Sequence, residues 1–296
     1  MNFATIDELQ QALADNQYVA DRPLATAIFL ALKLQKPLLL EGEAGVGKTE
    51  VAKTLAALTG RRLIRLQCYE GLDVSTTIYE WNYTRQMLQI RLLESIGAAD
   101  ARQAMHEIFG PEFLIRRPLL QAIEANDEQP PILLIDELDR ADEEFEAFLL
   151  ELLSDWQISI PEIGTISAAR PPTVILTSNR TREVHDALKR RCLFYWIDYP
   201  ALDKEQQIVA AKVPGASERL SRQVTVFVQE LRKLDLYKLP GVAETLDWAQ
   251  ALVALDAQEL SISSVEDTLG AILKYQDDIN QVRAGAVKSL VEKARR

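Results

Sequence analysis

Residues 42–49 have the types and spacing of a loop that binds phosphate. They read Gly-Glu-Ala-Gly-Val-Gly-Lys-Thr, which fits the pattern G-x-x-x-x-G-K-[ST], and they follow the apolar run 37–41 directly. Glycines let successive backbone N–H groups surround phosphate oxygens, and the start of a helix adds positive potential. We expect Lys48 to reach the β- and γ-phosphates of a nucleotide and the Thr49 hydroxyl to bind Mg²⁺. The predicted nucleotide-binding residues are Gly42, Glu43, Ala44, Gly45, Val46, Gly47, Lys48 and Thr49.

A pair of carboxylates follows a second apolar run. Residues 131–135 read Pro-Ile-Leu-Leu-Ile and precede Asp136 and Glu137. Ligands of open α/β sheets bind outside the carboxyl ends of the strands, so this pair is expected in the same region as the loop. We expect Asp136 to hold Mg²⁺ through water molecules and Glu137 to polarise the water that attacks the γ-phosphate. An acidic helix start is the alternative interpretation, because Asp136–Glu146 holds seven carboxylates.

Two further polar positions complete the candidate site. Asn179 follows the apolar run 173–177, and its amide can hold the attacking water or the γ-phosphate. Arg191 and its neighbour Arg190 precede the run 193–197, and an arginine there can reach the nucleotide of a neighbouring subunit as a finger. A turn or cap residue and a solvated arginine pair are the structural alternatives. The predicted catalytic residues are Lys48, Glu137, Asn179 and Arg191, and the predicted metal ligands are Thr49 and Asp136.

Apolar runs alternate with helical patterns through the first 200 residues. Several of these runs lack polar alternation, which is typical of strands covered on both faces of a parallel sheet. The predicted core strands are 37–41, 62–66, 131–135, 173–177 and 193–197. Helices are predicted within 5–35, at 48–59 and over the apolar face that runs from Phe145 to Leu153. We therefore predict an α/β nucleotide-binding domain over residues 1–200.

Two parts of this domain do not fit simple alternation of strand and helix. Residues 156–160 and 165–168 are predicted to form a hairpin. Residues 68–130 are less regular and are interpreted as an insertion, with helical patterns at 85–97, 99–109 and 117–125. Its aromatic residues fit a core, which we favour, or a contact surface shared with nearby arginines. The residues concerned are Tyr69, Tyr79, Trp81, Tyr83, Arg85 and Arg91.

Helical periodicity alone continues after residue 200. The patterns cover about 203–212, 217–234, 242–254, 264–275 and 279–295. Pro200 lies at the joint, where proline commonly ends one element before the next begins. We predict that residues 201–296 form a separate, small helical domain.

Charge and composition exclude several classes of protein. Lysine and arginine total 33 against 44 aspartate and glutamate residues, so the formal net charge is −11, the opposite of a nucleic-acid-binding surface. Cys68 and Cys192 are interpreted as small buried hydrophobic residues, and His106 and His185 as ordinary polar residues. The acidic start of the chain and the short apolar run Leu24–Leu32 indicate neither a secretion signal nor a membrane span, so we expect a cytoplasmic protein.

The order of these motifs resembles the MoxR family of AAA+ ATPases over nearly the whole chain. Residues 130–166 and 174–200 resemble the branch associated with maturation of carbon monoxide dehydrogenase and related molybdenum hydroxylases. The resemblance implies a P-loop AAA+ core, with a parallel sheet flanked by helices, followed by a small all-helical lid domain. It further implies that Gly42–Thr49 is the Walker A loop, Asp136 and Glu137 the Walker B pair and Asn179 the sensor 1 residue. Arg191 then corresponds to the arginine finger, with Arg190 as the alternative.

Two positions depart from the family pattern. Asp139 stands where the family usually has asparagine in D-E-[IVL]-N-R-A, although Arg140 is retained. Thr245 stands where the family commonly has a sensor 2 arginine after Gly-[AV]-Ser-Pro, since the segment here reads Gly-Val-Ala-Glu-Thr. No sensor 2 residue is therefore carried over to this chain.

The resemblance also implies a function. It implies hydrolysis of ATP with Mg²⁺, in a hexameric ring of identical chains whose nucleotide lies between subunits. It implies a partner with a von Willebrand factor A domain and a metalloenzyme client that the ATPase remodels or activates as a chaperone, with part of the insertion facing the ring axis or the client. The alternatives are a P-loop kinase or transferase, a nucleic-acid-associated AAA+ motor, which the negative charge opposes, and a scaffold that binds nucleotide without turnover.

Overall fold

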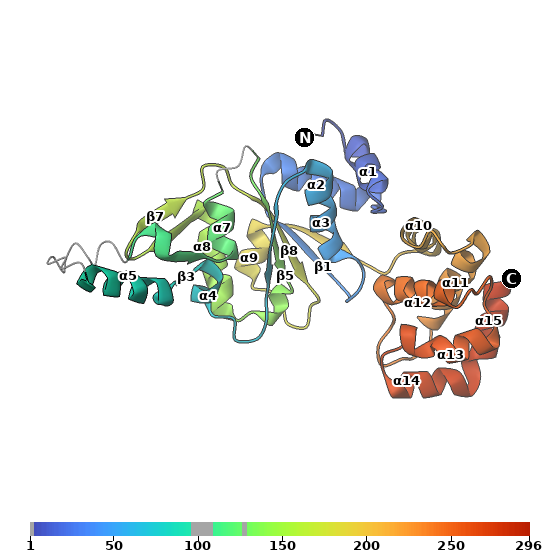
Figure 1. Ribbon diagram of the computed structural model, residues 1–296. Helices are drawn as coiled ribbons and strands as arrows, with labels where there is room; N and C mark the ends of the chain where they lie inside the picture. The colour runs from blue at the N-terminus through green and yellow to red at the C-terminus, as the bar shows by residue number, and fades with distance from the viewer. Residues whose placement is uncertain (1–2, 96–108, 126–128) are drawn as a thin grey trace. The chain divides into compact units, whose positions relative to one another are not determined.

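The computed structural model describes residues 3–95, 109–125 and 129–296 (Figure 1). The chain divides into two compact units, each described by itself. The first contains Thr26–Glu41 and Leu55–Tyr195, and the second contains Asn2–Ala25, Gly42–Thr54 and Trp196–Arg296. The predicted helical pattern at 99–109 lies almost entirely outside the described residues, as does His106.

A parallel five-stranded sheet forms the centre of the fold. Its order is β2 (Leu63–Gln67), β5 (Ile132–Asp136), β8 (Thr173–Ser178), β1 (Leu38–Gly42) and β9 (Leu193–Ile197). Strand β8 pairs in parallel with both neighbours, with Ile175 opposite Leu38 and Thr173 opposite Ile132. Every residue of β1 and β5 is buried, as expected for strands covered on both faces. The predicted α/β fold with a parallel sheet is confirmed.

Helices α2 (Arg22–Leu34), α3 (Lys48–Thr59), α8 (Glu143–Asp155) and α9 (Asp186–Arg191) connect these strands or precede them (Figure 1). The residues of α8 have the features that favour a helix: a capping side chain, an acidic first turn and one apolar face. The Asp142 carboxylate caps its start by accepting the Phe145 N–H at 2.9 Å, and acidic residues in the first turn favour the helix dipole. Phe145, Leu149 and Leu152 then lie on one buried face at helical spacing.

The insertion forms short elements beside the sheet. They are α4 (Val74–Ile78), β3 (Tyr79–Trp81), α5 (Tyr83–Ser95), η1 (Pro111–Phe113), β4 (Leu114–Arg116) and α7 (Pro118–Ile123). Trp81 is buried and packs edge-on against Tyr79 and Phe109, with ring centroids 5.9 and 5.3 Å apart. The interpretation as core is wrong for Tyr69 and Tyr83, which are 54% and 66% exposed because each lies outside the small β3–β4 sheet.

The predicted hairpin is present as β6 (Gln157–Ile160) and β7 (Gly164–Ser167), paired antiparallel. The region that follows the sheet is helical, with α10 (Leu202–Lys212), α11 (Glu218–Leu231), α12 (Val242–Ala254), α13 (Ile262–Ile272), α14 (Gln276–Gln281), the π-helical turn η3 (Val282–Ala286) and α15 (Val287–Arg295). Helix α1 (Ile6–Asp15) lies at the start of the chain. None of the helices in the described ranges is long and apolar enough to cross a membrane.

A fully buried ion pair lies inside the helical region. Glu205 of α10 accepts both guanidinium nitrogens of Arg232 at 2.7 Å, and neither side chain is more than 7% exposed. Gln229 and Thr245 donate further hydrogen bonds to the same carboxylate at 2.7 and 2.8 Å. Complete hydrogen bonding offsets the cost of burying both charges, so removing one partner leaves the other uncompensated.

We therefore expect Glu205→Ala to lower the free energy of unfolding by about 3–5 kcal/mol, because it leaves a buried unpaired guanidinium. Chemical denaturation followed by circular dichroism measures the change. The matched control is Arg219→Ala, which removes an exposed pair with Glu259 and should cost about 1 kcal/mol or less. Equal midpoints for the parent chain and Glu205→Ala would contradict this account of the pair.

Candidate functional site

The predicted phosphate loop joins β1 to α3 and has the backbone that its glycines allow. Gly45 and Gly47 have φ values of +77° and +96°, a region that residues with a Cβ atom rarely adopt. Lys48 is buried, and its Nζ donates to the carbonyl oxygens of Gly42 at 2.8 Å and Glu43 at 2.6 Å. The loop therefore curls around the ammonium group of its own lysine.

Contacts within the second unit fix the shape of this loop. The Ala243 N–H at the start of α12 donates to the Gly45 carbonyl at 3.0 Å, and the Tyr18 hydroxyl donates to the Gly47 carbonyl at 3.4 Å. A Cβ atom added to Gly45 would lie 2.9 Å from Glu244 Oε2. That oxygen ends a flexible side chain and can move aside, so it is the φ value of Gly45 that favours glycine at this position.

Asp136 is the last residue of β5, and both of its carboxylate oxygens have partners. Oδ1 accepts the Thr177 hydroxyl at 2.5 Å, while Oδ2 accepts Arg65 Nη2 at 2.6 Å and Nε at 3.1 Å. Sequence reasoning did not identify Arg65 or Thr177. Arg65 could have been noticed as a charged residue inside the apolar run 62–66, which forms the strand β2 that pairs with β5. A metal ion bound by Asp136 would share this carboxylate with Arg65.

The residues that follow β5 and β8 adopt left-handed backbone conformations. Glu137 has φ 56° and ψ 50°, and its N–H donates to Thr177 Oγ1 at 3.0 Å. Arg180, directly after Asn179, has φ 58°. Such conformations cost about 1–3 kcal/mol each in residues other than glycine and occur most often at functional sites. The chain therefore turns sharply at Glu137, directly after β5, and at Arg180, two residues after β8.

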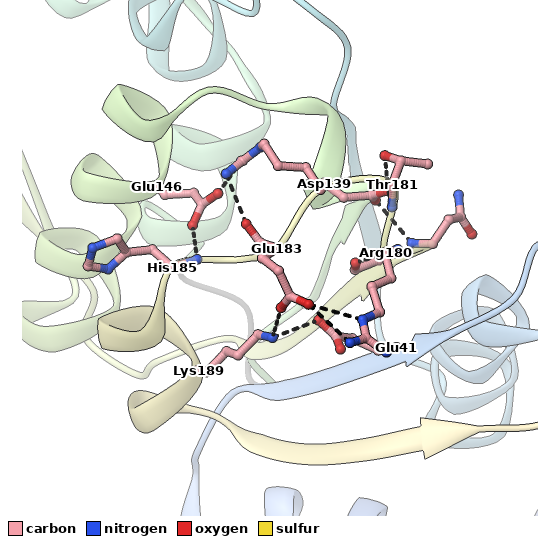
Figure 2. A network of polar contacts seen from close by, with 11 residues as sticks. Glu41, Asp139, Glu146, Arg180, Thr181, Glu183, His185 and Lys189 are labelled. Carbon is pink, nitrogen blue, oxygen red and sulfur yellow. Dashed lines mark hydrogen bonds and ion pairs between the residues drawn. The ribbon is translucent and has the colours of Figure 1, made fainter.

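Asp139 joins the two strand ends. Its carboxylate accepts the Asn179 N–H and the Thr181 N–H at 3.0 Å each, and the Thr181 hydroxyl at 2.6 Å (Figure 2). Burial alone would raise the pKa of Asp139, but these hydrogen bonds outweigh it and lower the pKa. The departure from asparagine therefore supplies two acceptor oxygens where asparagine would supply one. Sequence reasoning treated Asp139 only as a variation.

Glu146 holds the next part of the same segment. It is 1% exposed, and it accepts Arg182 through one oxygen and the His185 N–H through the other at 2.7 Å (Figure 2). His185 itself caps α9, with Nδ1 accepting the Ala187 N–H at 3.2 Å. Its role here is structural, in agreement with the sequence analysis.

The candidate finger lies apart from the two strand ends just described. Arg191 is the last residue of α9 and exposed, and its Nη1 donates to the Leu150 carbonyl of α8 at 2.5 Å. Arg190 beside it is also exposed. Asp136, Glu137 and Asn179 are brought together through Thr177 and Asp139, whereas Arg191 faces another part of its own unit.

Thr245 of α12, at the position where the MoxR family commonly has a sensor 2 arginine, is buried. Thr245 donates to Glu205 and to the Gly241 carbonyl, and Arg232 reaches its Oγ1 at 3.3 Å. The arginine next to this position is therefore already bound to Glu205.

The residues present fit a nucleotide with Mg²⁺. The glycine conformations, the lysine inside the loop and the start of the 12-residue helix α3 suit phosphate. Thr49 and Asp136 are oxygen donors of the kind Mg²⁺ prefers. Among the residues described, no group of three or more His, Cys, Asp or Glu side chains could hold a metal.

The parallel sheet and its glycine-rich loop define a P-loop nucleotide-binding domain. A model of AAA domains of the dynein-related subfamily matches residues 37–192, more than half of the chain. The chain belongs to this family and is an AAA+ ATPase of the dynein-related type.

Individual relatives are distant. The protein named Uncharacterized protein SH1500 of Staphylococcus haemolyticus is 24% identical over 287 residues, covering 94% of this chain and 98% of that protein. Uncharacterized protein SERP0979 of Staphylococcus epidermidis is 26% identical over 238 residues, covering 78% and 80%. Among solved structures, RuvB of Thermotoga maritima, described as a Holliday junction branch migration motor, has a TM-score of 0.48 and 15% identity, covering 94% and 74%.

Removal of the Asp139 carboxylate should release the segment that follows β8. In Asp139→Ala we expect the Asn179 and Thr181 amides to exchange with deuterium about tenfold faster or more, because hydrogen bonds to charged groups contribute about 1.5–3 kcal/mol. Since the pKa of Asp139 is lowered, this stabilisation is present above its unfolded value and lost as pH falls through the folded one. Asp142→Ala, which uncaps α8, is the control, and unchanged exchange in Asp139→Ala would refute the assignment.

Both cysteines should be unreactive in the folded chain. Burial raises the pKa of Cys68 and Cys192 to about 12, and for Cys68 the nearby carboxylates add to the effect. The thiolate is the reactive form, so we expect alkylation by iodoacetamide at neutral pH to be slower by about three orders of magnitude than in the unfolded chain. Alkylation should accelerate as pH approaches the raised pKa. Mass spectrometry measures it, and equal rates for folded and unfolded chains would disprove the prediction.

Proposed function

We propose that this chain hydrolyses ATP to ADP and phosphate at a site shared between copies in a ring of the MoxR type. The observation that carries the proposal is the phosphate loop together with the carboxylate pair Asp136 and Glu137, in a chain that belongs to the AAA domains. Strand β8 pairs with both β1 and β5, so the residues that end these strands lie at one edge of the sheet.

Each residue has a defined task in this proposal. Lys48 turns from the loop carbonyls to the β- and γ-phosphates, while Thr49 and Asp136 hold Mg²⁺, which neutralises phosphate charge when bound. Glu137 accepts a proton from the attacking water and orients it. Asn179, placed by Asp139, hydrogen-bonds that water or the γ-phosphate.

The positions of the positive charges support a site between copies. The lid offers no cation at Thr245, because Arg232 is bound to Glu205. Arg191 is exposed, donates a hydrogen bond to the Leu150 carbonyl of its own chain, and in a ring can reach the nucleotide of the next copy. Such an arginine contributes about 10³–10⁵ in rate where it has been measured. A hexamer is the proposed assembly, with Arg191 as finger and Arg190 as the alternative.

The client and partner are proposed from the resemblance of residues 130–166 and 174–200 to the MoxR branch. The chain would act as a chaperone that remodels or activates a metalloenzyme, together with a partner that contains a von Willebrand factor A domain. Exposed apolar side chains on α5 support the presence of a protein contact surface in the insertion. They are Tyr83, Met87, Leu88 and Leu92.

Two substitutions test the proposed chemistry. Lys48→Ala should abolish ATP binding, because the phosphates lose their ammonium partner. Glu137→Gln should retain ATP binding while hydrolysis falls by about 10²–10⁴, the usual contribution of a general base. Phosphate release and binding of a fluorescent ATP analogue measure the two effects, and Glu143→Gln, an exposed carboxylate at the start of α8, is the control. Hydrolysis at the parent rate by Glu137→Gln would contradict the proposal.

A further inference from the structure

Glu41 is a buried carboxylate without a full set of partners. It is 3% exposed, and among the described residues its Oε1 has no hydrogen bond. Glu41 is the last residue before the phosphate loop, and its register partner on β8 is Ser178, the last residue before Asn179. Glu41 therefore adjoins the phosphate loop along the chain. Across the sheet it pairs with the residue at which the segment leading to α9 begins.

Lys189 of α9 is the cation that faces this carboxylate. Its Nζ lies 3.5 Å from Glu41 Oε1 and 2.9 Å from Glu183 Oε2 (Figure 2). Glu183 also contacts Arg180, and its side chain is 64% exposed. The hydrogen bond from Lys189 to Glu183, together with the charge of Glu41, raises the pKa of Lys189, so the ammonium group is charged. Lys189 thus stands between an exposed carboxylate and a buried one.

The three acids that hold residues 179–191 differ in how completely they are satisfied. Asp139 accepts three hydrogen bonds and Glu146 accepts two, all at ordinary or short distances. The Oε1 atom of Glu41, in contrast, has no hydrogen bond among the described residues and lies at the long distance of 3.5 Å from Lys189 Nζ. Burying a poorly compensated carboxylate is costly, and an apolar side chain of similar size would avoid the cost. Packing alone therefore does not account for a glutamate at this position.

Helix α9 is short, so a shift of Lys189 carries its neighbours with it. Arg190 and Arg191 follow Lys189 directly in the last turn. On the other side, Gly42 follows Glu41 directly, and its carbonyl oxygen accepts Lys48 Nζ at 2.8 Å. In the proposed function Lys48 turns toward the phosphates of ATP, which would break this hydrogen bond and remove one constraint on the backbone next to Glu41.

We propose that Glu41 is a positioning residue that acts through Lys189. It transmits the state of the phosphate loop to α9, and so sets where the arginine of α9 is presented to the ATP of the neighbouring copy. This inference rests on the proposed function. It adds that ATP bound in the phosphate loop of one copy sets the position of the arginine that this copy presents to the ATP of its neighbour.

The test uses mixtures of two full-length variants. An acceptor with Arg190→Ala and Arg191→Ala supplies no finger, and a donor with Glu137→Gln does not hydrolyse ATP. Hydrolysis in the mixture then comes from acceptor sites completed by donor arginines. Glu41→Gln in the donor should lower this hydrolysis about tenfold, because a displacement of about 1 Å at a reacting group can cost as much as 10²-fold. The same change in the acceptor should lower it less.

Three further donor variants separate the effect of the contact between Lys189 and Glu41 from misfolding and from a general change of charge. Lys189→Met, which alters a less buried side chain, should reproduce the loss, and Lys189→Arg, which keeps the charge, should restore most of the rate. Glu183→Gln keeps the contact between Lys189 and Glu41 and should retain most of the stimulation. ATP binding and the unfolding temperature of the Glu41→Gln chain are measured in parallel.

The outcomes separate the inference from the function on which it rests. Full stimulation by the Glu41→Gln donor, or an equal loss when Glu41→Gln is in donor and acceptor, would overturn the inference, since Glu41 would then have no role or act on its own site. Absence of stimulation by the unmodified donor would contradict the shared site itself, and the inference with it.

Discussion

The parallel pairing of β8 with β1 and β5 is the constraint on which the candidate site depends. Parallel neighbours end at the same edge, so this pairing brings the ends of β1, β8 and β5 together although they lie far apart in sequence. The edge carries Glu41, Ser178 and Asp136, followed by the phosphate loop, Asn179 and Glu137. The contacts of Thr177 with Asp136 and Glu137, and of Asp139 with Asn179, depend on that placement.

Buried carboxylates turn this edge into a defined arrangement. Asp139 fixes the backbone at Asn179, Glu146 fixes the turn before α9, and Glu41 faces Lys189 within α9. The loop backbone and the strained residue Glu137 supply the groups expected to contact the nucleotide. In the helical region a buried carboxylate also holds a neighbouring side chain in place, since Glu205 binds Arg232 beside Thr245. Several acidic residues of this chain thus serve to position other groups.

The sequence predicted the sheet and the hairpin because their signals are local. Unbroken apolar runs mark β1, β5 and β8, and the glycines of the phosphate loop mark where β1 ends. The residues that position the site were missed because their partners are distant in the chain. Arg65 and Asp136 are 71 residues apart, and Arg182 and Glu146 are 36 apart. A charged residue inside an apolar strand or on the buried face of a helix was the one local signal, and it does not reveal the partner. The roles assigned to Lys48, Thr49, Asp136, Glu137, Asn179 and Arg191 stay predictions.

The most direct test of a shared site is the specific ATPase activity measured across a wide range of protein concentrations. The measurement is made on the parent chain, on Arg191→Ala and on equal mixtures of the two. A site shared between copies predicts activity per chain that rises with concentration, and an arginine variant that binds ATP without hydrolysing it. Activity that is independent of concentration and unaffected by loss of Arg191 would contradict the account.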